Sequence, residues 1–368
     1  MDHNQAIQRS LSIVIPSWNG RELLEKYLPS VVSAATAYQA PSQRLSGQKI
    51  EIIVVDDAST DGTCAWLNTH YASVRAERNE RRLGFAPTVN RGVRAARYPL
   101  VYVLNNDVAI EPGTLPPLAD HFTHSDVFAV ASQVYDYDTG VLRGAGQVGE
   151  FRRGFLGVHR RYFAADRAPN PGTPWLTLFA TGGSSMFDRE KLLALGGFDE
   201  MFAPFGWEDV ELSLRAWKQG FEAHYEPQSR VWHQFSSTIA PRFSRREVRT
   251  IYERNRLLAH WLHLDSPLQI TVHAVSLLVK LLVSAFTGGW EMWSATAQAL
   301  KLMHRIRAKR RELRGKQRRK LNDVLCQVAG QMNRPGAMIL NEKSAPKAGA
   351  RGEGRETRDE GLGERGEG

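Results

Sequence analysis

Acidic side chains form three short clusters along the sequence, and each cluster contains residues that could take part in chemistry. The clusters are Asp56-Asp57, Asn105-Asn106-Asp107 and Trp207-Glu208-Asp209. A carboxylate can take the proton from an attacking hydroxyl group, and a hard divalent cation held by oxygen ligands can neutralise a diphosphate. The three clusters therefore indicate metal-assisted transfer from a phosphate-bearing donor.

The cluster at Glu208 and Asp209 is the candidate catalytic cluster, because it opens a predicted helix. Acidic residues in a first helical turn are also favoured by the helix dipole, so their position has a second explanation. The aromatic stretch Phe202–Phe205 and Trp207 should shield this helix end from water. Shielding raises the pKa of a carboxyl group and suits it to act as a base. We expect Asp209 to be the base and Glu208 to be the second candidate.

Asp107 is the candidate metal ligand, because it follows the predicted buried strand 101–104. One carboxylate is sufficient for Mg²⁺ or Mn²⁺, since these ions usually keep phosphate and water ligands as well. A turn in which an Asn or Asp side chain closes the strand would explain the same residues. His233 ends a second β-like run and is the other candidate ligand, although a packed histidine would give the same pattern.

Asp56 and Asp57 are candidate nucleotide contacts. They end a predicted strand and precede a helix, and carboxylates there can accept hydrogen bonds from a nucleobase or from ribose hydroxyl groups. Capping of the following helix accounts for Asp61. It does not account for two like charges side by side at the strand end, so we predict a ligand for this pair.

Short apolar runs alternate with helical patterns over the first third of the chain. The predicted strands are 12–16, 50–55 and 100–104, and the predicted helices are 23–37, 63–71 and 87–96. A β-α-β-α-β succession predicts an α/β fold with an open, mostly parallel sheet flanked by helices. Ligands bind at the carboxyl ends of such strands, which is where the first two acidic clusters fall.

The remainder of the chain is less regular, and its composition changes along its length. The glycine-rich stretch 141–157 is predicted to be a loop, and Val210–Gln219 to be a helix. The tail after residue 340 is rich in Gly, Glu and Arg and is predicted to be disordered. The predicted divisions are an N-terminal tail 1–10, a main domain 11–265 with a first half 11–107 and a second half 108–265, a helical, amphipathic and basic segment 266–340, and a disordered tail 341–368.

The net charge of +9 comes from one segment. Eleven Lys or Arg residues lie between Lys301 and Lys320 against the single acidic residue Glu312, so the rest of the chain sums to about −1. This basic run contains no aromatic residue that could stack on a base. We therefore expect no nucleic-acid partner. The two cysteines, Cys64 and Cys326, lie far apart and fit a reducing compartment.

Together these residues resemble the family 2 glycosyltransferases, in particular the rhamnosyltransferase-like bacterial members. The resemblance covers residues 12–261 and rests on Ser12-Ile13-Val14-Ile15-Pro16-Ser17-Trp18-Asn19-Gly20, Asp56-Asp57, Leu83-Gly84-Phe85, Asn90, Asn105-Asn106-Asp107, Gly182-Gly183, Trp207-Glu208-Asp209 and His233. It implies a glycosyltransferase A fold for a catalytic domain 11–265, in which 11–107 is the nucleotide-sugar half and 108–265 the acceptor half. It also implies a nucleotide-sugar donor, Mn²⁺ or Mg²⁺, and an inverting single displacement. The implied acceptor is a saccharide or a lipid-linked molecule.

The resemblance also implies roles for individual residues. Asp57 is similar to the acid that contacts the nucleobase, Asp107 to the last residue of the Asp-x-Asp metal motif, Asp209 to the base, and His233 to a further metal ligand. The implied nucleotide site is Pro16, Asn19, Asp56, Asp57, Gly84, Asn90, Asn105 and Asn106, and the implied sugar and acceptor site is Gly182, Gly183 and Trp207. Asn105 departs from the motif, which has an aspartate there, so the site has one negative charge fewer.

The apolar segment 268–287 is predicted to be a helix with one narrow polar stripe. The stripe consists of Gln269, His273, Ser276, Lys280, Ser284 and Thr287. A spanning helix needs no such stripe, and Lys280 near its middle would be costly in a bilayer. We expect the helix to lie on an anionic membrane surface, helped by the basic run that follows, with the protein on the cytoplasmic side. A helical arm that forms a homo-oligomer is the alternative.

The sequence as a whole predicts an inverting, metal-dependent glycosyltransferase that builds a surface polysaccharide or glycolipid. Two alternatives from other classes are a non-catalytic nucleic-acid- or membrane-binding protein and a degenerate transferase that acts as an assembly partner. The first would use the basic run, and the second is disfavoured by the presence of both Asp107 and Asp209.

Overall fold

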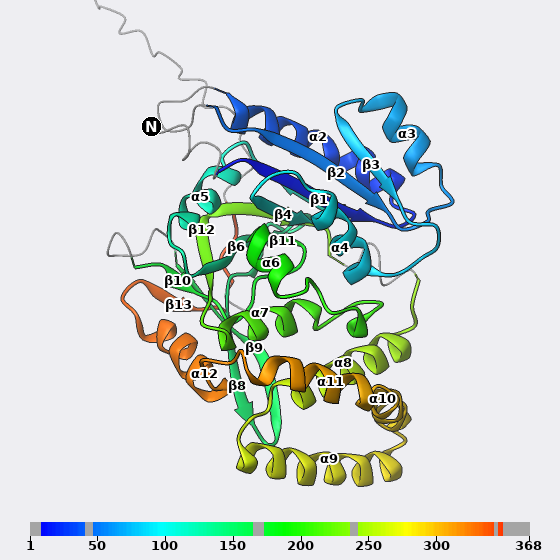
Figure 1. Cartoon of the computed structure of the whole chain (residues 1–368), viewed down its shortest axis with the longest axis vertical. Helices are drawn as coiled ribbons and strands as arrows, with labels where there is room; N and C mark the ends of the chain where they lie inside the picture. Colours follow the sequence, from blue (N-terminus) through cyan, green and yellow to red (C-terminus); the bar gives the residue numbers. More distant parts are fainter. Residues whose placement is uncertain (1–8, 41–46, 165–172, 236–241, 342–344, 349–368) are drawn as a thin grey trace, which may run out of the picture.

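The computed structural model of the protein describes residues 9–40, 47–164, 173–235, 242–341 and 345–348. Figure 1 shows a central sheet with helices packed around it, and a group of C-terminal helices at the opposite end of the molecule from the N-terminal strands. The sheet has the strand order β10-β12-β6-β11-β4-β1-β2-β3, with β5 and β7 paired outside this path. The predicted α/β fold is confirmed.

Parallel strands and their crossover helices build the first third of the chain. In chain order they are β1 (Leu11–Ser17), α2 (Arg21–Gln39), β2 (Ile50–Asp56), α3 (Thr63–His70), β3 (Val74–Arg78), α4 (Phe85–Ala95) and β4 (Leu100–Leu104). β1 lies between β2 and β4, and β3 pairs with β2, all in parallel. β3 was not predicted from the sequence. It is an edge strand whose sequence, Val-Arg-Ala-Glu-Arg, lacks an apolar run.

The second part of the chain completes the central sheet with mixed pairing. Its elements up to the catalytic helix are β5 (Val108–Ile110), α5 (Leu115–Asp120), η1 (His121–Thr123), β6 (Val127–Asp136), β7 (Leu142–Gly144), β8 (Gly146–Arg152), β9 (Phe155–Ala164), β10 (Trp175–Leu176), β11 (Ser184–Asp188), α6 (Arg189–Ala194) and η2 (Glu200–Phe202). β11 runs antiparallel to both β4 and β6. This pairing carries the sheet from the parallel strands of the first third of the chain into the part that follows.

The glycine-rich stretch 141–157 is not a loop, as the sequence predicted, but a set of strands. β8 and β9 form an antiparallel pair, and β13 (Ala337–Ile339) pairs with the outer side of β9. The glycines lie where large side chains cover the strand. A Cβ atom at Gly146 would come within 2.4 Å of the Tyr162 ring, and one at Gly149 within 2.4 Å of Leu178. Glycine here permits close packing rather than a turn.

The catalytic helix α7 (Glu208–Lys218) leads into β12 (Glu222–His233), which runs parallel to β6. The C-terminal elements are α8 (Arg245–His263), α9 (Pro267–Thr287), α10 (Trp290–Lys301), α11 (Met303–Arg314), α12 (Leu321–Ala329) and η3 (Gly330–Asn333). One hydrophobic core contains residues of β8, α7 and α8 together with Met292, Ile306 and Val324. The C-terminal helices therefore share a core with residues of the segment 145–264.

Most of the two predicted tails lies outside the described residues. This holds for residues 1–8 at the N-terminus and for 342–344 and 349–368 at the C-terminus. Residues 345–348 are described. Lys347 forms an isolated β-bridge with Val141, so this short part of the predicted disordered tail is ordered against the sheet.

Candidate active site

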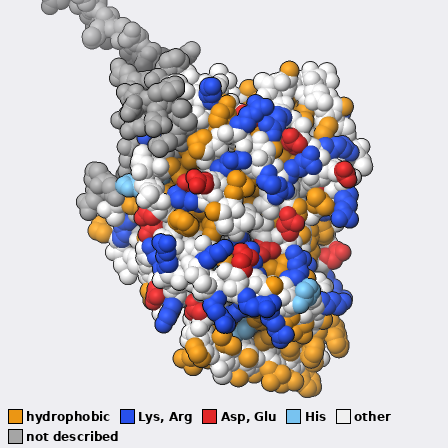
Figure 2. Space-filling model, viewed as in Figure 1, with side chains coloured by type: hydrophobic (Ala, Val, Ile, Leu, Met, Phe, Trp, Pro, Cys, Tyr) orange, Lys and Arg blue, Asp and Glu red, His pale blue; other side chains and the backbone are white. Residues whose placement is uncertain are grey.

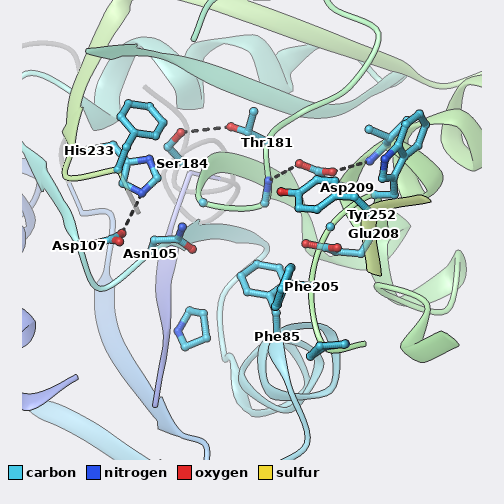
Figure 3. A pocket seen from close by; sticks show the side chains of 18 of the residues that line it. Phe85, Asn105, Asp107, Thr181, Ser184, Phe205, Glu208, Asp209, His233 and Tyr252 are labelled. Atoms are coloured by element: carbon cyan, nitrogen blue, oxygen red, sulfur yellow. Dashed lines mark hydrogen bonds and ion pairs between the residues drawn. The ribbon is translucent and has the colours of Figure 1, made fainter. Parts of the chain in front are cut away.

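A cavity of about 1280 Å³ opens at the carboxyl ends of β1 and β4. Figure 3 shows it between the Asp107–His233 pair on one side and the Glu208–Asp209 pair on the other. A volume above the usual range of a single small-molecule pocket has room for two substrates. The predicted site residues that line it are Pro16, Asp57, Gly84, Asn105, Asn106, Asp107, Gly182, Gly183, Trp207, Glu208, Asp209 and His233.

Three predicted nucleotide residues, Asn19, Asp56 and Asn90, do not line this cavity. The Asp56 side chain is fully buried, and it accepts hydrogen bonds from Arg78 Nη1 at 2.9 Å and from the backbone N–H of Ser59 at 3.1 Å. Its contacts hold the turn behind the strand end, so the geometry gives Asp56 a positioning role.

Asn19 and Asn90 also hold backbone segments. The Asn19 side chain accepts a hydrogen bond from the Thr60 N–H at 2.8 Å. Asn90 donates to the carbonyl of Phe198 at 2.8 Å and accepts from its N–H at 2.9 Å. The two Asn90 contacts join α4 to the segment that precedes α7. Both residues therefore support the cavity from behind its wall.

Asp57 reaches the cavity wall and fixes the loop that covers one end of it. Its carboxylate accepts hydrogen bonds from the N–H groups of Leu83 and Gly84, both at 2.8 Å, and from Asn79 Nδ2 at 2.8 Å. Gly84 has φ +94°, a conformation that other residues rarely adopt. The predicted residues Asp57 and Gly84 thus form one unit, in which the Asp57 side chain organises the loop at the cavity wall.

Asp107 and His233 meet at the junction of the two halves of the sheet. The strand pairing of β5 with β12 sets His233 opposite Val108, and this brings His233 Nε2 within 3.0 Å of Asp107 Oδ1. Ligands at neighbouring positions of an octahedral ion with bonds of about 2.1 Å are about 3.0 Å apart. The carboxylate and imidazole therefore fit a divalent cation such as Mn²⁺.

These two residues would form an incomplete coordination shell. Among the described residues, no group of three or more His, Cys, Asp or Glu side chains is placed to hold a metal ion. An ion at Asp107 and His233 would thus take its other ligands from substrate phosphates and water, as expected for a site that binds a metal together with its donor.

Asn105 and Gly183 are in direct contact, and each fixes the position of the other. The Asn105 N–H donates to the Gly183 carbonyl at 2.9 Å, and a Cβ atom on Gly183 would come within 2.6 Å of the Asn105 side-chain amide. Gly182 packs against the Phe85 ring in a similar way, since a Cβ atom on Gly182 would come within 3.1 Å of that ring. Asn106 donates to Ser17 Oγ at 3.0 Å. The two glycines leave room for the neighbouring side chains on the cavity floor.

The two carboxylates of the catalytic cluster lie at the first turn of α7. Trp207 precedes the helix with φ +71°, which is an outlier for a bulky residue and turns the chain sharply into the helix. Asn255 on α8 holds this turn, since its Nδ2 donates to the carbonyls of Phe202 at 2.7 Å and Gly206 at 2.7 Å. This role of Asn255 was not predicted from the sequence.

Glu208 and Asp209 have different hydrogen-bond environments. Asp209 accepts hydrogen bonds from the N–H groups of Gly182 at 3.3 Å and Val210 at 2.8 Å. Glu208 Oε2 has no hydrogen-bond partner among the described residues. Burial raises the pKa of Glu208 to about 8, and the nearby charge of Asp209 adds to the shift.

Burial also raises the pKa of Asp209, although its two N–H donors oppose this shift. Two neighbouring carboxyl groups with raised pKa values titrate together and are suited to hold and release a proton near neutral pH. The Tyr252 hydroxyl lies beside both carboxylates (Figure 3), and burial raises its pKa to about 12 with a further contribution from their charges.

A buried ion pair supports the catalytic helix from behind. Arg215 Nη2 lies 2.6 Å from Glu211 Oε2, and both side chains are almost completely buried. Burial alone would raise the pKa of Glu211, but Arg215 and His263 together lower it to about 2. Arg215 also donates to the Gly197 carbonyl at 2.9 Å. This pair fixes α7 to the segment that precedes the catalytic turn.

Basic residues around the cavity were not predicted from the sequence, because they come from distant parts of the chain. The guanidinium of Arg82 stacks on the Trp18 ring at 3.3 Å, and that of Arg242 lies 4.7 Å from the same ring. Arg82 lines the cavity, and further basic residues of its lining are Arg143, His159, Arg161, Arg245 and Arg249. This lining suits anionic ligands such as phosphates.

The sequence matches the models of two known protein families. Residues 12–196, half of the chain, match "Glycosyl transferase family 2". Residues 161–240 match "N-terminal domain of galactosyltransferase". The first match covers the strand ends with Asp57 and Asp107, and the second covers the helix with Asp209 and the strand that ends at His233.

Comparison with individual proteins gives similar enzymes at low identity. Polypeptide N-acetylgalactosaminyltransferase 16 from Homo sapiens is 29% identical over 196 residues, which cover 50% of this chain and 34% of that protein. Polypeptide N-acetylgalactosaminyltransferase 10 from Mus musculus is 28% identical over 238 residues, which cover 62% of this chain and 38% of that protein. The chain thus matches less than half the length of these relatives.

A solved structure shares the fold. The crystal structure of GalNAc-T7 with UDP, GalNAc and Mn²⁺ superposes with a TM-score of 0.53 at 18% identity, covering 70% of this chain and 48% of that chain. This likeness concerns the arrangement of strands and helices.

Proposed function

The chain belongs to glycosyl transferase family 2, and we propose that it transfers a sugar from a nucleotide-sugar donor to a hydroxyl group of an acceptor, with inversion at the anomeric carbon. The observation that carries this proposal is the position of an aspartate–histidine pair and a pair of carboxylates on opposite sides of one cavity (Figure 3). One pair, Asp107 and His233, suits the diphosphate end of a donor. The other, Glu208 and Asp209, suits the attacking hydroxyl group of an acceptor.

The reaction is a single displacement in which the acceptor oxygen forms a bond to the anomeric carbon as the bond to the nucleoside diphosphate breaks. Asp209 takes the proton of the acceptor hydroxyl, and the diphosphate leaves with the bonding electron pair. The opposed arrangement of base and leaving group supports attack from the face opposite the diphosphate, which inverts the configuration. Phe205 and Trp207, which line the cavity, exclude water that would otherwise compete with the acceptor.

Asp107 and His233 are the residues that would hold a divalent cation, Mn²⁺ or Mg²⁺. When bound, such an ion would neutralise charge on the leaving diphosphate. The arginines at the cavity wall are placed to bind the remaining phosphate charge. Asn105 offers an amide where a carboxylate would hold the ion more tightly, so we expect the metal to bind mainly together with the donor.

The choice of base rests on hydrogen bonding. The N–H groups of Gly182 and Val210 fix the Asp209 carboxylate, whereas Glu208 Oε2 has no such donor among the described residues. A fixed carboxylate presents its oxygen to a substrate with little loss of entropy. Glu208 would keep a proton at neutral pH because of its raised pKa, and it would limit the negative charge at this end of the cavity.

The acceptor is proposed to be a saccharide or lipid-linked molecule used in surface polysaccharide or glycolipid synthesis. The basic lining of the cavity by Arg143, His159 and Arg161 supports an acceptor that carries phosphate. A role as a degenerate assembly partner is disfavoured, because Asp107 and Asp209 both reach the cavity. A nucleic-acid-binding role is also disfavoured, because the basic run lacks aromatic residues for base stacking.

The proposal is tested by incubating the full-length protein with a panel of nucleotide-sugars and Mn²⁺ and measuring release of nucleoside diphosphate. We expect one donor to be hydrolysed slowly in the absence of acceptor, and Asp209→Asn to lack this hydrolysis. Anomeric NMR of the transferred product would give the stereochemistry. Turnover of no donor, together with failure of every nucleoside diphosphate to bind by calorimetry, would overturn the proposal.

A further inference from the structure

Helix α9 exposes most of its apolar residues and turns most of its polar ones toward the protein, which is the reverse of the usual surface helix. His273 and Ser284 are buried, and Gln269, Ser276 and Lys280 are partly buried. The apolar residues whose exposed fraction is above one half are Leu268, Val275, Leu278, Val279, Leu282, Val283 and Phe286. Phe286 is 90% exposed. This continuous apolar face is called the α9 face below.

Specific contacts fix the orientation of the helix. Lys280 Nζ lies 2.9 Å from Glu253 Oε1 on α8. His273 donates from Nδ1 to the Gly154 carbonyl at 2.7 Å, and its Nε2 accepts from Trp261 Nε1 at 3.2 Å. Rotation of α9 to bury its apolar residues would break all of these contacts. The exposure of the α9 face is therefore set by the fold.

The neighbouring helix α10 adds aromatic residues to this end of the molecule. Trp290 is 57% exposed and Trp293 is 42% exposed, and Leu300 is also exposed. Figure 2 shows hydrophobic side chains gathered at the end of the molecule that α9 forms, with a band of Lys and Arg side chains beside them. Tryptophan is favoured at the boundary between the headgroups and the acyl chains of a bilayer.

The charges around the α9 face favour an anionic partner. Arg152 and Arg153 are exposed in the β8–β9 turn, next to Gly154, which packs against Ser276 of α9. Lys301 and Arg305 are exposed where α10 passes into α11. These basic residues would attract the headgroups of anionic lipids.

Acidic residues are scarce in the same segment, which weighs against a second copy of the chain as the occupant. From residue 267 to residue 311 the sequence has one acidic residue, Glu291, and its side chain lies 3.7 Å from Arg246. Two copies that met through their α9 faces would bring like charges together at the rim, which is unfavourable.

The length and composition of α9 also allow a helix that crosses a membrane. Its 21 residues have a mean hydropathy of 1.8 over the most apolar window. A spanning position would require Lys280 to leave Glu253 and His273 to leave Gly154, and would place a lysine in the bilayer. The contacts with the catalytic part of the chain thus favour a helix that lies in the membrane surface.

We propose that the α9 face, flanked by Trp290, Trp293 and the basic residues beside them, docks the protein on the surface of an anionic lipid bilayer. Docking would orient the active-site cavity relative to the membrane through α8. One face of α8 contacts α9 at Glu253 and Trp261, and Val248, Arg249 and Tyr252 of the same helix line the cavity. This orientation suits an acceptor presented from the bilayer, a consequence that rests on the proposed transfer reaction.

The test is flotation of the full-length protein with vesicles of phosphatidylcholine alone or with added phosphatidylglycerol, at low and high salt. We expect binding to the anionic vesicles that high salt weakens in part, because salt screens charge but not apolar burial. The double substitution Leu278→Glu and Leu282→Glu should lower the bound fraction about tenfold or more. Leu193→Glu, on an exposed leucine of α6, is the matched control and should bind like the wild type.

Separate measurements keep this test independent of catalysis. Nucleoside diphosphate binding by calorimetry should be the same in the wild type and the double variant, which shows that the variant is folded. Failure of the wild-type protein to float with anionic vesicles would overturn the proposal. A wild-type dimer in analytical ultracentrifugation that the double variant dissociates, without flotation, would assign the α9 face to a second copy instead. Resistance of the natural membrane-bound protein to alkaline carbonate would assign α9 as a spanning helix and would also overturn it.

Discussion

The active-site cavity and the α9 face arrange polar and apolar residues in opposite ways. In the cavity, the carboxylates of Asp107 and Asp209 point into a concave space whose walls also contain aromatic rings. On α9, polar residues such as Lys280 point into the protein and apolar residues such as Leu278 point outward. The first arrangement concentrates charge where a polar ligand can be enclosed. The second leaves apolar surface where only another apolar phase can cover it.

An amphipathic pattern in a sequence shows only that two faces of a helix or strand differ in polarity. Which face turns inward depends on partners elsewhere in the chain. The polar stripe of α9 turns inward because Glu253 and the Gly154 carbonyl meet it with complementary groups. The cavity residues turn toward a space because parallel strands end side by side there.

Asp209→Asn tests whether the cavity works through one fixed carboxylate. We expect turnover to fall by about a hundredfold or more, the usual contribution of a positioned base, while donor binding stays close to that of the wild type. Steady-state kinetics with the identified donor and acceptor, together with calorimetric binding of nucleoside diphosphate, measure both. Glu208→Gln is the matched variant, and a larger loss of turnover in that variant would transfer the role of base to Glu208.

Asp107→Asn tests the opposite wall of the cavity. We expect the Mn²⁺-dependent part of nucleoside diphosphate binding to weaken by at least about a hundredfold, since even supporting partners of metal ligands contribute about 10–100-fold. His233→Gln should weaken it less, because a neutral imidazole is a poorer ligand than a carboxylate for a hard ion. Calorimetric titrations with and without Mn²⁺ compare the two. Equal Mn²⁺ dependence in the wild type and the Asp107 variant would remove Asp107 from the metal site.

Much of the nucleotide half could be predicted from the sequence, because short buried parallel strands have a strong local signature. The strands at 12–16, 50–55 and 100–104 all occur, and α4 and α7 begin within two residues of their predicted starts. Pro16, Asp57 and Asp107, at or just after the ends of these strands, lie in one cavity because parallel strands bring their carboxyl ends together. The antiparallel pairing of β5 with β12 brings Asp107 and His233 together.

The features that could not be predicted depend on contacts between distant residues. The glycines of β8 and β9 look like loop residues until the Tyr162 ring and Leu178 are seen to pack over them. Asn255, which holds the catalytic turn, lies about fifty residues after the carbonyls that it contacts. Asp56 was predicted beside the nucleotide because it neighbours Asp57, yet adjacent residues of a strand point to opposite sides, and Asp56 is buried against Arg78.

Glu208→Gln also tests the buried charge at the catalytic turn through the stability of the protein. In the folded state the pKa of Glu208 is raised from 4.5 to about 8, so the folded protein binds a proton that the unfolded chain has released. The stabilising contribution of the protonated form is complete below about pH 4.5 and is lost as the pH rises toward 8. The wild type should therefore lose stability relative to Glu208→Gln over this range.

Urea denaturation of both proteins at several pH values measures this difference, and the comparison removes contributions from groups that both proteins share. Asp209→Asn serves as the control that removes the neighbouring charge. It should reduce the pH dependence, because repulsion by Asp209 contributes to the raised pKa of Glu208. A difference between wild type and Glu208→Gln that is constant with pH would contradict the raised pKa.

Lys280→Met gives the smallest expected effect and tests what orients α9. The Lys280–Glu253 pair is partly exposed, with side-chain exposures of 36% and 25%, and such pairs contribute about 0–1 kcal/mol. In the variant, Glu253 would still have Arg256 as a partner of opposite charge, because Arg256 Nη1 lies 3.9 Å from Glu253 Oε2. Methionine preserves the length of the side chain, so the free energy of unfolding in urea should change by less than about 1 kcal/mol.

Vesicle binding should be retained, because His273 still fixes the helix through Gly154 and Trp261. A loss of vesicle binding in Lys280→Met, with stability unchanged, would show that the ion pair alone sets the outward orientation of the α9 face.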